Sequence, residues 1–145
     1  MNGVSAGNKK LELFVVAAIL GVLATLLLDA LAGMQREMET AVMQSEVAAL
    51  RVELLDRLSH REVFGGVLPD SDNPVVWTGR SPDGYLGEFD RPPEQRGVWY
   101  FDRSAKLLVY RSRGGEDYRF RLARNAGRVN GPATLAGVGL VRVEN

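Results

Sequence analysis

The longest apolar stretch of the chain lies close to its N-terminus. Leu13–Leu28 contains no charged residue and no proline, and Thr25 is its only polar side chain. With Leu11 and Glu12 the stretch is 18 residues long, which corresponds to about 27 Å of helix and is close to the thickness of a bilayer core. The pattern predicts a membrane-spanning helix, whose bounds we place at residues 8–30.

A second helical pattern continues from Leu31 to about Leu58 without a turn signal. Its apolar residues form two strips. The first strip comprises Leu31, Met34, Met38, Ala41, Ala48, Val52 and Leu55, and the second strip comprises Met43, Val47, Leu50, Leu54 and Leu58. Together they span roughly 200° of the helix, about twice the stripe of an ordinary surface helix. Residues 31–60 are therefore predicted to extend the membrane helix as an amphipathic segment, with Gly65-Gly66 as its stop.

A helix that is apolar over half its circumference needs two partners. One can be the C-terminal domain of the same chain, and the other would be a neighbouring subunit. The alternatives are that a single domain wraps the helix, or that the helix forms a coiled coil.

The last third of the chain has the alternation and turn residues of β-structure. Strands are expected at Gly97–Asp102, Lys106–Ser112, Glu116–Leu122 and Val138–Val143, with turns at 103–105 and 114–115 and a loop at 125–132. The predicted fold class is α+β: a long N-terminal helix packed on a small sheet of about four antiparallel strands within residues 97–145.

Residues 61–96 are predicted to form a connecting loop rich in proline and glycine, with short extended pieces at Pro74–Thr78 and Tyr85–Phe89. The side-chain oxygens of Asp70, Asp72 and Asn73 are of the kind that binds Ca²⁺. We favour a structural turn for these three residues.

Composition argues against several classes of protein. The chain has 18 basic and 18 acidic residues, so no global field favours nucleic acid or a membrane surface. It has no cysteine and one histidine, which argues against a zinc site, and we interpret His60 as a solvated surface residue. Neither a phosphate-binding loop nor a nucleophile-elbow motif is present. We therefore expect no enzyme, no metal and no cofactor.

Glu12 stands one turn inside the apolar segment, where a carboxylate is costly unless a positive charge pairs with it. The simplest explanation places it at the headgroup level, or pairs it with Lys9. Its position is more specific, however, because Glu12 is the fifth residue after Gly7 and an unbroken apolar helix follows. This arrangement resembles the N-terminus of type IV pilins and type II secretion pseudopilins.

The resemblance implies a prepilin leader at residues 1–7, which the prepilin peptidase removes by cutting between Gly7 and Asn8. It implies N-methylation of the new amine on Asn8. Glu12 would be the assembly carboxylate that meets the amine of a neighbouring subunit. The implied partners are the peptidase, other pilin or pseudopilin subunits and the inner-membrane assembly platform. The chain departs from the family pattern in having Asn8, Lys9 and Lys10 where small or apolar residues are usual.

Lys9 and Lys10 precede the apolar segment, so the positive-inside rule places the N-terminus in the cytoplasm. With the resemblance, this predicts a single-pass inner-membrane protein whose C-terminal domain lies in the periplasm or in an extracellular filament. Two alternatives stay open. One is an uncleaved bitopic scaffold protein with a periplasmic helix and β domain. The other is a soluble exported β domain cut after Ala32, because Ala30-Leu31-Ala32 fits a signal-peptidase site.

Arginine is dense in the predicted strands. Arg111, Arg113, Arg119 and Arg121 could form a basic surface that contacts DNA phosphates or a partner. We favour a solvated β face, or arginines paired with acids of the next subunit, over DNA binding.

Overall fold

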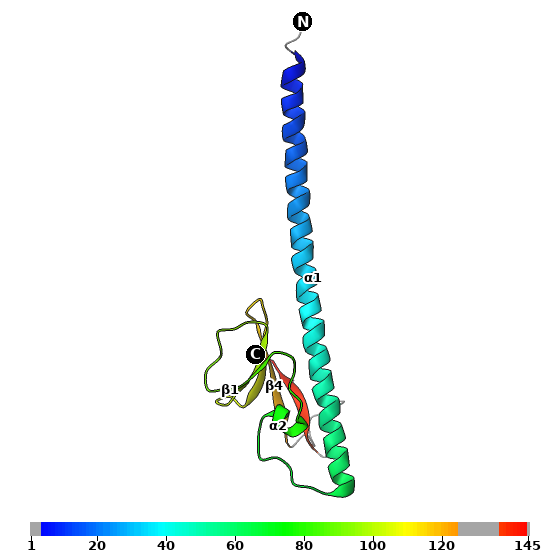
Figure 1. The fold of residues 1–145 in the computed structure, drawn as a ribbon, viewed down its shortest axis with the longest axis vertical. Coiled ribbons are helices and arrows are strands. Elements are labelled where there is room, and N and C mark those ends of the chain that lie inside the picture. Colours follow the sequence, from blue (N-terminus) through cyan, green and yellow to red (C-terminus); the bar gives the residue numbers. More distant parts are fainter. Residues whose placement is uncertain (1–3, 125–136, 145) are drawn as a thin grey trace. The chain divides into compact units, whose positions relative to one another are not determined.

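The structure is a computed structural model that describes residues 4–124 and 137–144. The chain divides into two compact units, Met1–Thr40 and Ala41–Asn145. Its elements in chain order (Figure 1) are α1 (Val4–Phe64), α2 (Pro74–Thr78), β1 (Tyr85–Phe89), β2 (Val98–Asp102), β3 (Leu107–Arg111), β4 (Asp117–Ala123) and β5 (Gly139–Val143). The predicted α+β class is confirmed. The predicted loop at 125–132 lies outside the described residues.

Helix α1 ends where two consecutive glycines follow it. Gly65 has a φ of +78°, and its amide donates to the Arg61 carbonyl at 2.7 Å. A glycine in this left-handed conformation is a common helix terminator. The stop at Gly65-Gly66 is therefore confirmed, although the helix runs to Phe64 and so passes the predicted boundary at residue 60.

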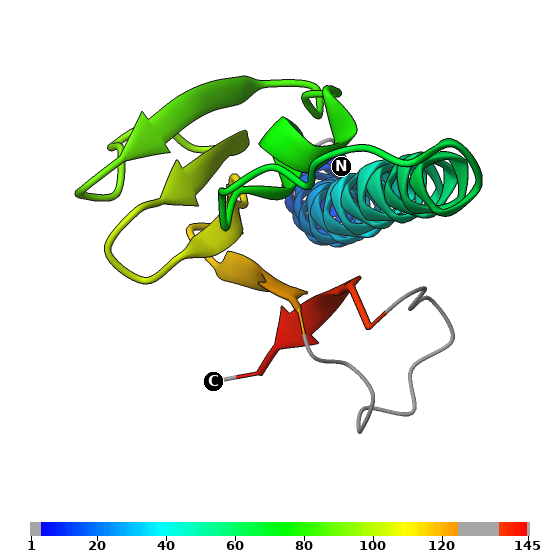
Figure 2. The same cartoon turned by 90° about the horizontal axis from the view of Figure 1, so that it is seen from below.

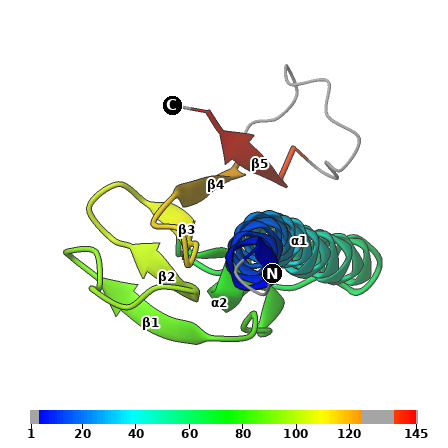
Figure 3. The ribbon, with the colours of Figure 1, turned by 90° about the horizontal axis from the view of Figure 1, so that it is seen from above.

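The second unit contains a five-stranded sheet with the order β1-β2-β3-β4-β5, and Figure 3 shows the strands side by side in that order. The pairs from β2 to β5 are antiparallel. The four strands predicted from residue 97 onward are all present, within one or two residues at each end.

Strand β1 corrects the prediction of about four antiparallel strands. It pairs with β2 in parallel, with Tyr85 opposite Trp99 and Phe89 opposite Asp102. The extended piece expected at Tyr85–Phe89 thus joins the sheet as a fifth strand. A parallel neighbour requires a crossover, which is usually a helix; here the irregular segment 90–97 makes the connection.

The expectation of an extended piece at Pro74–Thr78 is wrong, because this segment is helix α2. The Asn73 side chain accepts a hydrogen bond from the Val75 amide at 3.0 Å, which caps the first turn. Pro74 suits the first helical position, and Gly79 ends the helix with a φ of +65°. These capping residues outweigh the strand preference of the two valines between them. This cap agrees with the prediction that Asn73 belongs to a structural turn.

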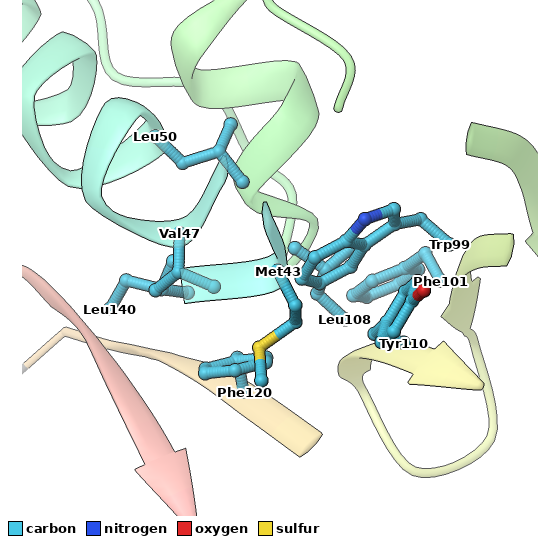
Figure 4. Packing of buried hydrophobic residues seen from close by; sticks show 9 residues of the cluster. All are labelled: Met43, Val47, Leu50, Trp99, Phe101, Leu108, Tyr110, Phe120 and Leu140. Atoms are coloured by element: carbon cyan, nitrogen blue, oxygen red, sulfur yellow. The ribbon is translucent and has the colours of Figure 1, made fainter. Parts of the chain in front are cut away.

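The core of the second unit lies between α1 and one face of the sheet, which we call the inner face. Met43, Val47 and Leu50 of the second strip pack against side chains from four strands (Figure 4): Trp99, Phe101, Leu108, Tyr110, Phe120 and Leu140. The Trp99 ring lies 4.9 Å from Tyr110 and 5.8 Å from Phe120. The prediction that the helix packs on the β-sheet is confirmed.

A second cluster continues this core toward the end of α1. Leu54 and Leu58 pack with Trp77 of α2, Leu122 of β4 and Val138. Figure 2 shows α2 beside the last turns of α1. All five residues of the second strip are therefore buried by the chain's own second unit.

The opposite, outer face of the sheet also carries buried residues. Tyr100, Leu107 and Val109 form a small cluster there with Phe89 and Val143. Burial raises the pKa of the Tyr100 hydroxyl above its usual range.

The core packing predicts a large difference between two leucines. Leu50→Ala removes a side chain that is 1% exposed and should lower the free energy of unfolding by about 3 kcal/mol, through lost burial and the cavity left behind. Leu86→Ala is the matched control because Leu86 is 42% exposed, and it should cost less than about 1 kcal/mol. Urea unfolding of both variants checks this, and equal losses would contradict the described core.

Candidate membrane and assembly segment

The first unit consists of α1 from its start to Thr40, and its apolar side chains are exposed. The most apolar 18-residue window has a mean hydropathy of 2.6, and none of it is buried. Phe14 is 74% exposed and Leu27 70% exposed. By length and composition this helix can cross a membrane once, or it can serve as an export signal. The segment is thus compatible with the predicted membrane span, whose bounds stay a prediction.

The polar groups of this helix fall into two kinds. The Thr25 hydroxyl donates to the Gly21 carbonyl at 2.9 Å, which satisfies it within its own helix. Glu12 is exposed, and no described residue pairs with its carboxylate. The structure places Asn8 four residues before Glu12 in the same helix, so the two share one face. A cation that neutralises Glu12 therefore has open access to it.

Gly7 and Asn8, the residues of the predicted cleavage point, are also exposed in α1. A Cβ added at Gly7 would meet nothing within 4 Å. A substitution at Gly7 is therefore free of steric conflict in this structure, and cleavage and methylation here stay predictions.

Beyond Thr40, the second unit buries one strip of α1 and leaves most of the other strip exposed. In the first strip, Ala41 and Ala48 are exposed and Val52 is 68% exposed. Val42 and Val63, outside both strips, are 60% and 73% exposed. The sequence argument that the helix needs a second partner is consistent with this uncovered surface.

The four arginines predicted as a basic surface differ in their surroundings. Arg111 makes a two-pronged ion pair with Asp117, at 2.9 and 3.0 Å, and donates to the Pro93 carbonyl at 2.6 Å. The hydrogen bonds to Asp117 raise the pKa of the Arg111 guanidinium. Arg111 thus holds the 90–97 connection and two strands together.

Arg113 and Arg121 are exposed, and Arg119 is half-buried. Strict alternation in β4 puts Tyr118 and Phe120 against the inner cluster and Arg119 and Arg121 on the outer face, as predicted. Contact of these side chains with DNA or a partner stays a prediction.

The acidic loop at 70–73 makes salt bridges to the protein's own cations. The Asp72 carboxylate lies 3.0 Å from Lys106 Nζ and 3.2 Å from an Arg124 nitrogen. Arg124 also donates to the Ser71 carbonyl and lies over the Trp77 ring. These contacts attach the loop to the sheet. Within the described residues, no cluster of three or more acidic or histidine side chains could hold a metal ion.

His60 is exposed and packs against Phe64, with the ring centres 4.6 Å apart and the ring planes tilted by 38°. The surface position predicted for it is confirmed.

Sequence reasoning missed one feature of the second unit. A hollow of about 280 Å³ is lined by Met43, Gln44, Val47, Arg51, Phe120 and Arg142. These residues come from α1, β4 and β5, so their sequence positions gave no signal that they meet.

Comparison of the chain with protein-family models, curated proteins and solved structures gives no match. The resemblance to pilins rests on the motif at Gly7–Glu12, on the apolar helix that follows it and on the pilin-like architecture of a long N-terminal helix with a small, mostly antiparallel sheet.

The role of Arg111 can be tested by comparing two arginines. Arg111→Ala should lower the free energy of unfolding by about 2 kcal/mol, because it leaves the Asp117 carboxylate, 18% exposed, without its partner. Arg121→Ala should change it by less than about 0.5 kcal/mol. Chemical denaturation measures both values. A loss at Arg121 equal to that at Arg111 would show that the ion pair has no special structural role.

Proposed function

We propose that this chain is a structural, pilin-like subunit, either a pseudopilin or a minor pilin. In this proposal it is inserted in the inner membrane by α1 and assembled with other subunits into a type IV pilus or a type II secretion pseudopilus. The observation that carries the proposal is an uncovered apolar segment, residues 11–28, whose one charged residue is Glu12, five residues after Gly7.

The apolar helix supports assembly because two environments suit it. In the bilayer, lipid covers the side chains of residues 13–28. In a filament, the equivalent helices of neighbouring subunits would cover them instead. Because both surroundings are apolar, moving the helix from one to the other changes hydrophobic burial little. Close packing and polar contacts between helices then decide whether the helix stays in lipid or associates with its neighbours.

Glu12 supplies such a polar contact. A carboxylate in the middle of a membrane helix costs about 3 kcal/mol on insertion scales, although a position near the helix end costs less. The amine of a neighbouring subunit would offset part of this cost by pairing with it in an apolar surrounding. The pair forms only at one relative position of two subunits, so Glu12 would also set their register.

The uncovered first strip supports the same role for the later part of α1. Ala41 and Ala48 of this strip, and Ser45 between them in the sequence, are small and exposed, and small residues allow two helices to approach closely. Helix α1 also continues without a break through Ala30–Ala32. Signal-peptidase cleavage after Ala32 would therefore cut inside a helix, which counts against the exported soluble domain.

The proposal predicts the effect of Glu12→Ala in cells that lack the wild-type copy. Membrane insertion should be unchanged, because the substitution makes the helix more apolar. The amount of subunit recovered in sheared filaments or pseudopili should fall at least about tenfold, which corresponds to about 1.4 kcal/mol of lost assembly energy. Immunoblots of the membrane and filament fractions measure both quantities.

Glu37→Ala is the matched control, because Glu37 is an exposed acid of the same unit outside the apolar segment. It should assemble normally. Wild-type amounts of the Glu12→Ala subunit in filaments would overturn the role of Glu12.

A further inference from the structure

Two opposite charges lie close together along the first turns of α1 but on opposite sides of the helix. Lys10 and Glu12 are both exposed, and neither belongs to an ion pair among the described residues. Each residue turns the helix by about 100°, so these two side chains leave it about 160° apart. Residues with this spacing do not face each other. The Lys10 ammonium is therefore placed to meet the carboxylate of another copy and not that of its own chain.

Few cations of a second copy can reach Glu12 at its level in the membrane. The only basic residues before the apolar segment are Lys9 and Lys10, and the next one along the chain is Arg36. Arg36 lies about 36 Å further along the helix, which is more than the thickness of a bilayer core. For copies inserted in the same orientation, the available cations are thus the two lysines and the terminal amine. Cleavage after Gly7 would bring that amine to Asn8.

The place of Lys10 on the helix favours it over Lys9. Lys9 lies about 60° from Glu12, on the same side, so a second copy that offered Lys9 would also bring the two Glu12 carboxylates toward each other. Lys10 lies on the opposite side and avoids this repulsion. Its Cα differs from that of Glu12 by only about 3 Å in height along the helix, a distance that a lysine side chain can bridge. Two copies at the same depth in one membrane can therefore pair.

The two sides of the helix also differ in the size of their side chains. Within about 45° of Glu12, all residues of the 13–28 segment are large, and they are Val16, Ile19, Leu23 and Leu26. Within the same angle of Lys10, the residues are Phe14, Ala17, Gly21, Ala24 and Leu28. The middle of the Lys10 side is thus formed by small residues, and a Cβ added at Gly21 would meet nothing within 4 Å. Large side chains that face small ones allow two helices to approach closely.

We propose that the Lys10 side of α1 in one copy of this chain binds the Glu12 side of α1 in a second copy, with the Lys10 ammonium paired to the Glu12 carboxylate. The inference rests on the proposed assembly role and names a contact that copies make in the membrane. It does not require removal of the leader, because the cation is a lysine side chain. The contact joins two different sides, so it is heterologous and extends from copy to copy.

Cysteine cross-linking tests the contact in the full-length chain in its membrane, because the natural chain has no cysteine. Gly21 and Leu23 lie about three turns after Lys10 and Glu12 and repeat their geometry within the span. Membranes that hold differently tagged Gly21→Cys and Leu23→Cys copies should form mixed disulfide dimers under mild oxidation. Their yield should be at least about tenfold above that of either variant alone, because like sides do not meet and a disulfide needs Cα atoms within about 7 Å.

Val22→Cys is the matched control for the position of the cysteine. Val22 lies at the same height, about 100° around the helix from both Gly21 and Leu23. Membranes that hold Val22→Cys and Leu23→Cys copies should give the low yield. A yield of the Gly21–Leu23 mixed dimer no higher than this control would overturn the contact.

Charge exchange between the two copies tests the ion pair. Lys10→Glu in the Gly21→Cys copy should reduce the mixed dimer about tenfold, because it sets two carboxylates against each other. Glu12→Lys in the Leu23→Cys copy should then restore the mixed dimer, which also shows that both variants insert. Lys9→Gln in the Gly21→Cys copy should leave the yield unchanged. A yield that ignores Lys10→Glu, is not restored by Glu12→Lys, or falls equally with Lys9→Gln would overturn the pair.

A retained leader separates Lys10 from the amine at Asn8. Gly7→Val in both copies should keep residues 1–7 attached, and the mixed dimer should form in the same yield. Loss of the mixed dimer in this background would overturn the proposal, because the terminal amine would then be the required cation.

The outcomes separate this contact from the proposed function. Absence of the mixed dimer in cells whose filaments still require Glu12 would refute the Lys10 contact and leave the assembly role intact. A strong mixed dimer in cells where the Glu12→Ala subunit enters filaments in wild-type amounts would support the contact and count against the assembly role of Glu12.

Discussion

The N-terminal half of α1 needs two things that the rest of the chain does not supply: an apolar surrounding for its side chains and a positive partner for Glu12. Residues 13–28 are apolar on every side, and Glu12 adds a carboxylate that no described residue neutralises. Lipid can cover the apolar side chains, but it supplies no stable positive partner at this depth. Another molecule that brings both an apolar helix and a positive group satisfies the two needs together. These two needs are the physical basis of the proposed assembly role of the N-terminal helix.

The later part of α1 also has an apolar surface that the chain itself does not cover. The sheet buries the second strip through the cluster around Trp99 and Leu108, and it leaves Ala48 and Val52 of the first strip exposed. The 90–97 connection and the Arg111–Asp117 pair hold the outer side of the sheet together. The β domain is thus stabilised by its own core, while the helix keeps an uncovered apolar surface that the proposed function assigns to other subunits.

Periodicity predicted much of this fold. The helical spacing of the apolar residues predicted two apolar strips on α1, although it did not show that the strip of Met43, Val47 and Leu50 is the one that packs on the sheet. The alternation of Tyr118, Phe120 and Leu122 identified the inner face of β4. Helix α2 was missed because its valines favour a strand, whereas the Asn73 cap decides the local structure. The parallel β1 was missed because its crossover contains no helix. The hollow between Arg51 and Arg142 depends on three elements meeting in space, which one-dimensional patterns do not encode.

The central claim is that this helix is the processed assembly helix of a pilin-like subunit, and the mass of the N-terminus tests it most directly. Intact mass and N-terminal sequencing of the protein extracted from membranes should show a chain that begins at Asn8, with one added methyl group on its amine. A chain that begins at Met1 would indicate a permanent membrane anchor, and one that begins at Gly33 would indicate an exported soluble domain. Either of these results would contradict the account.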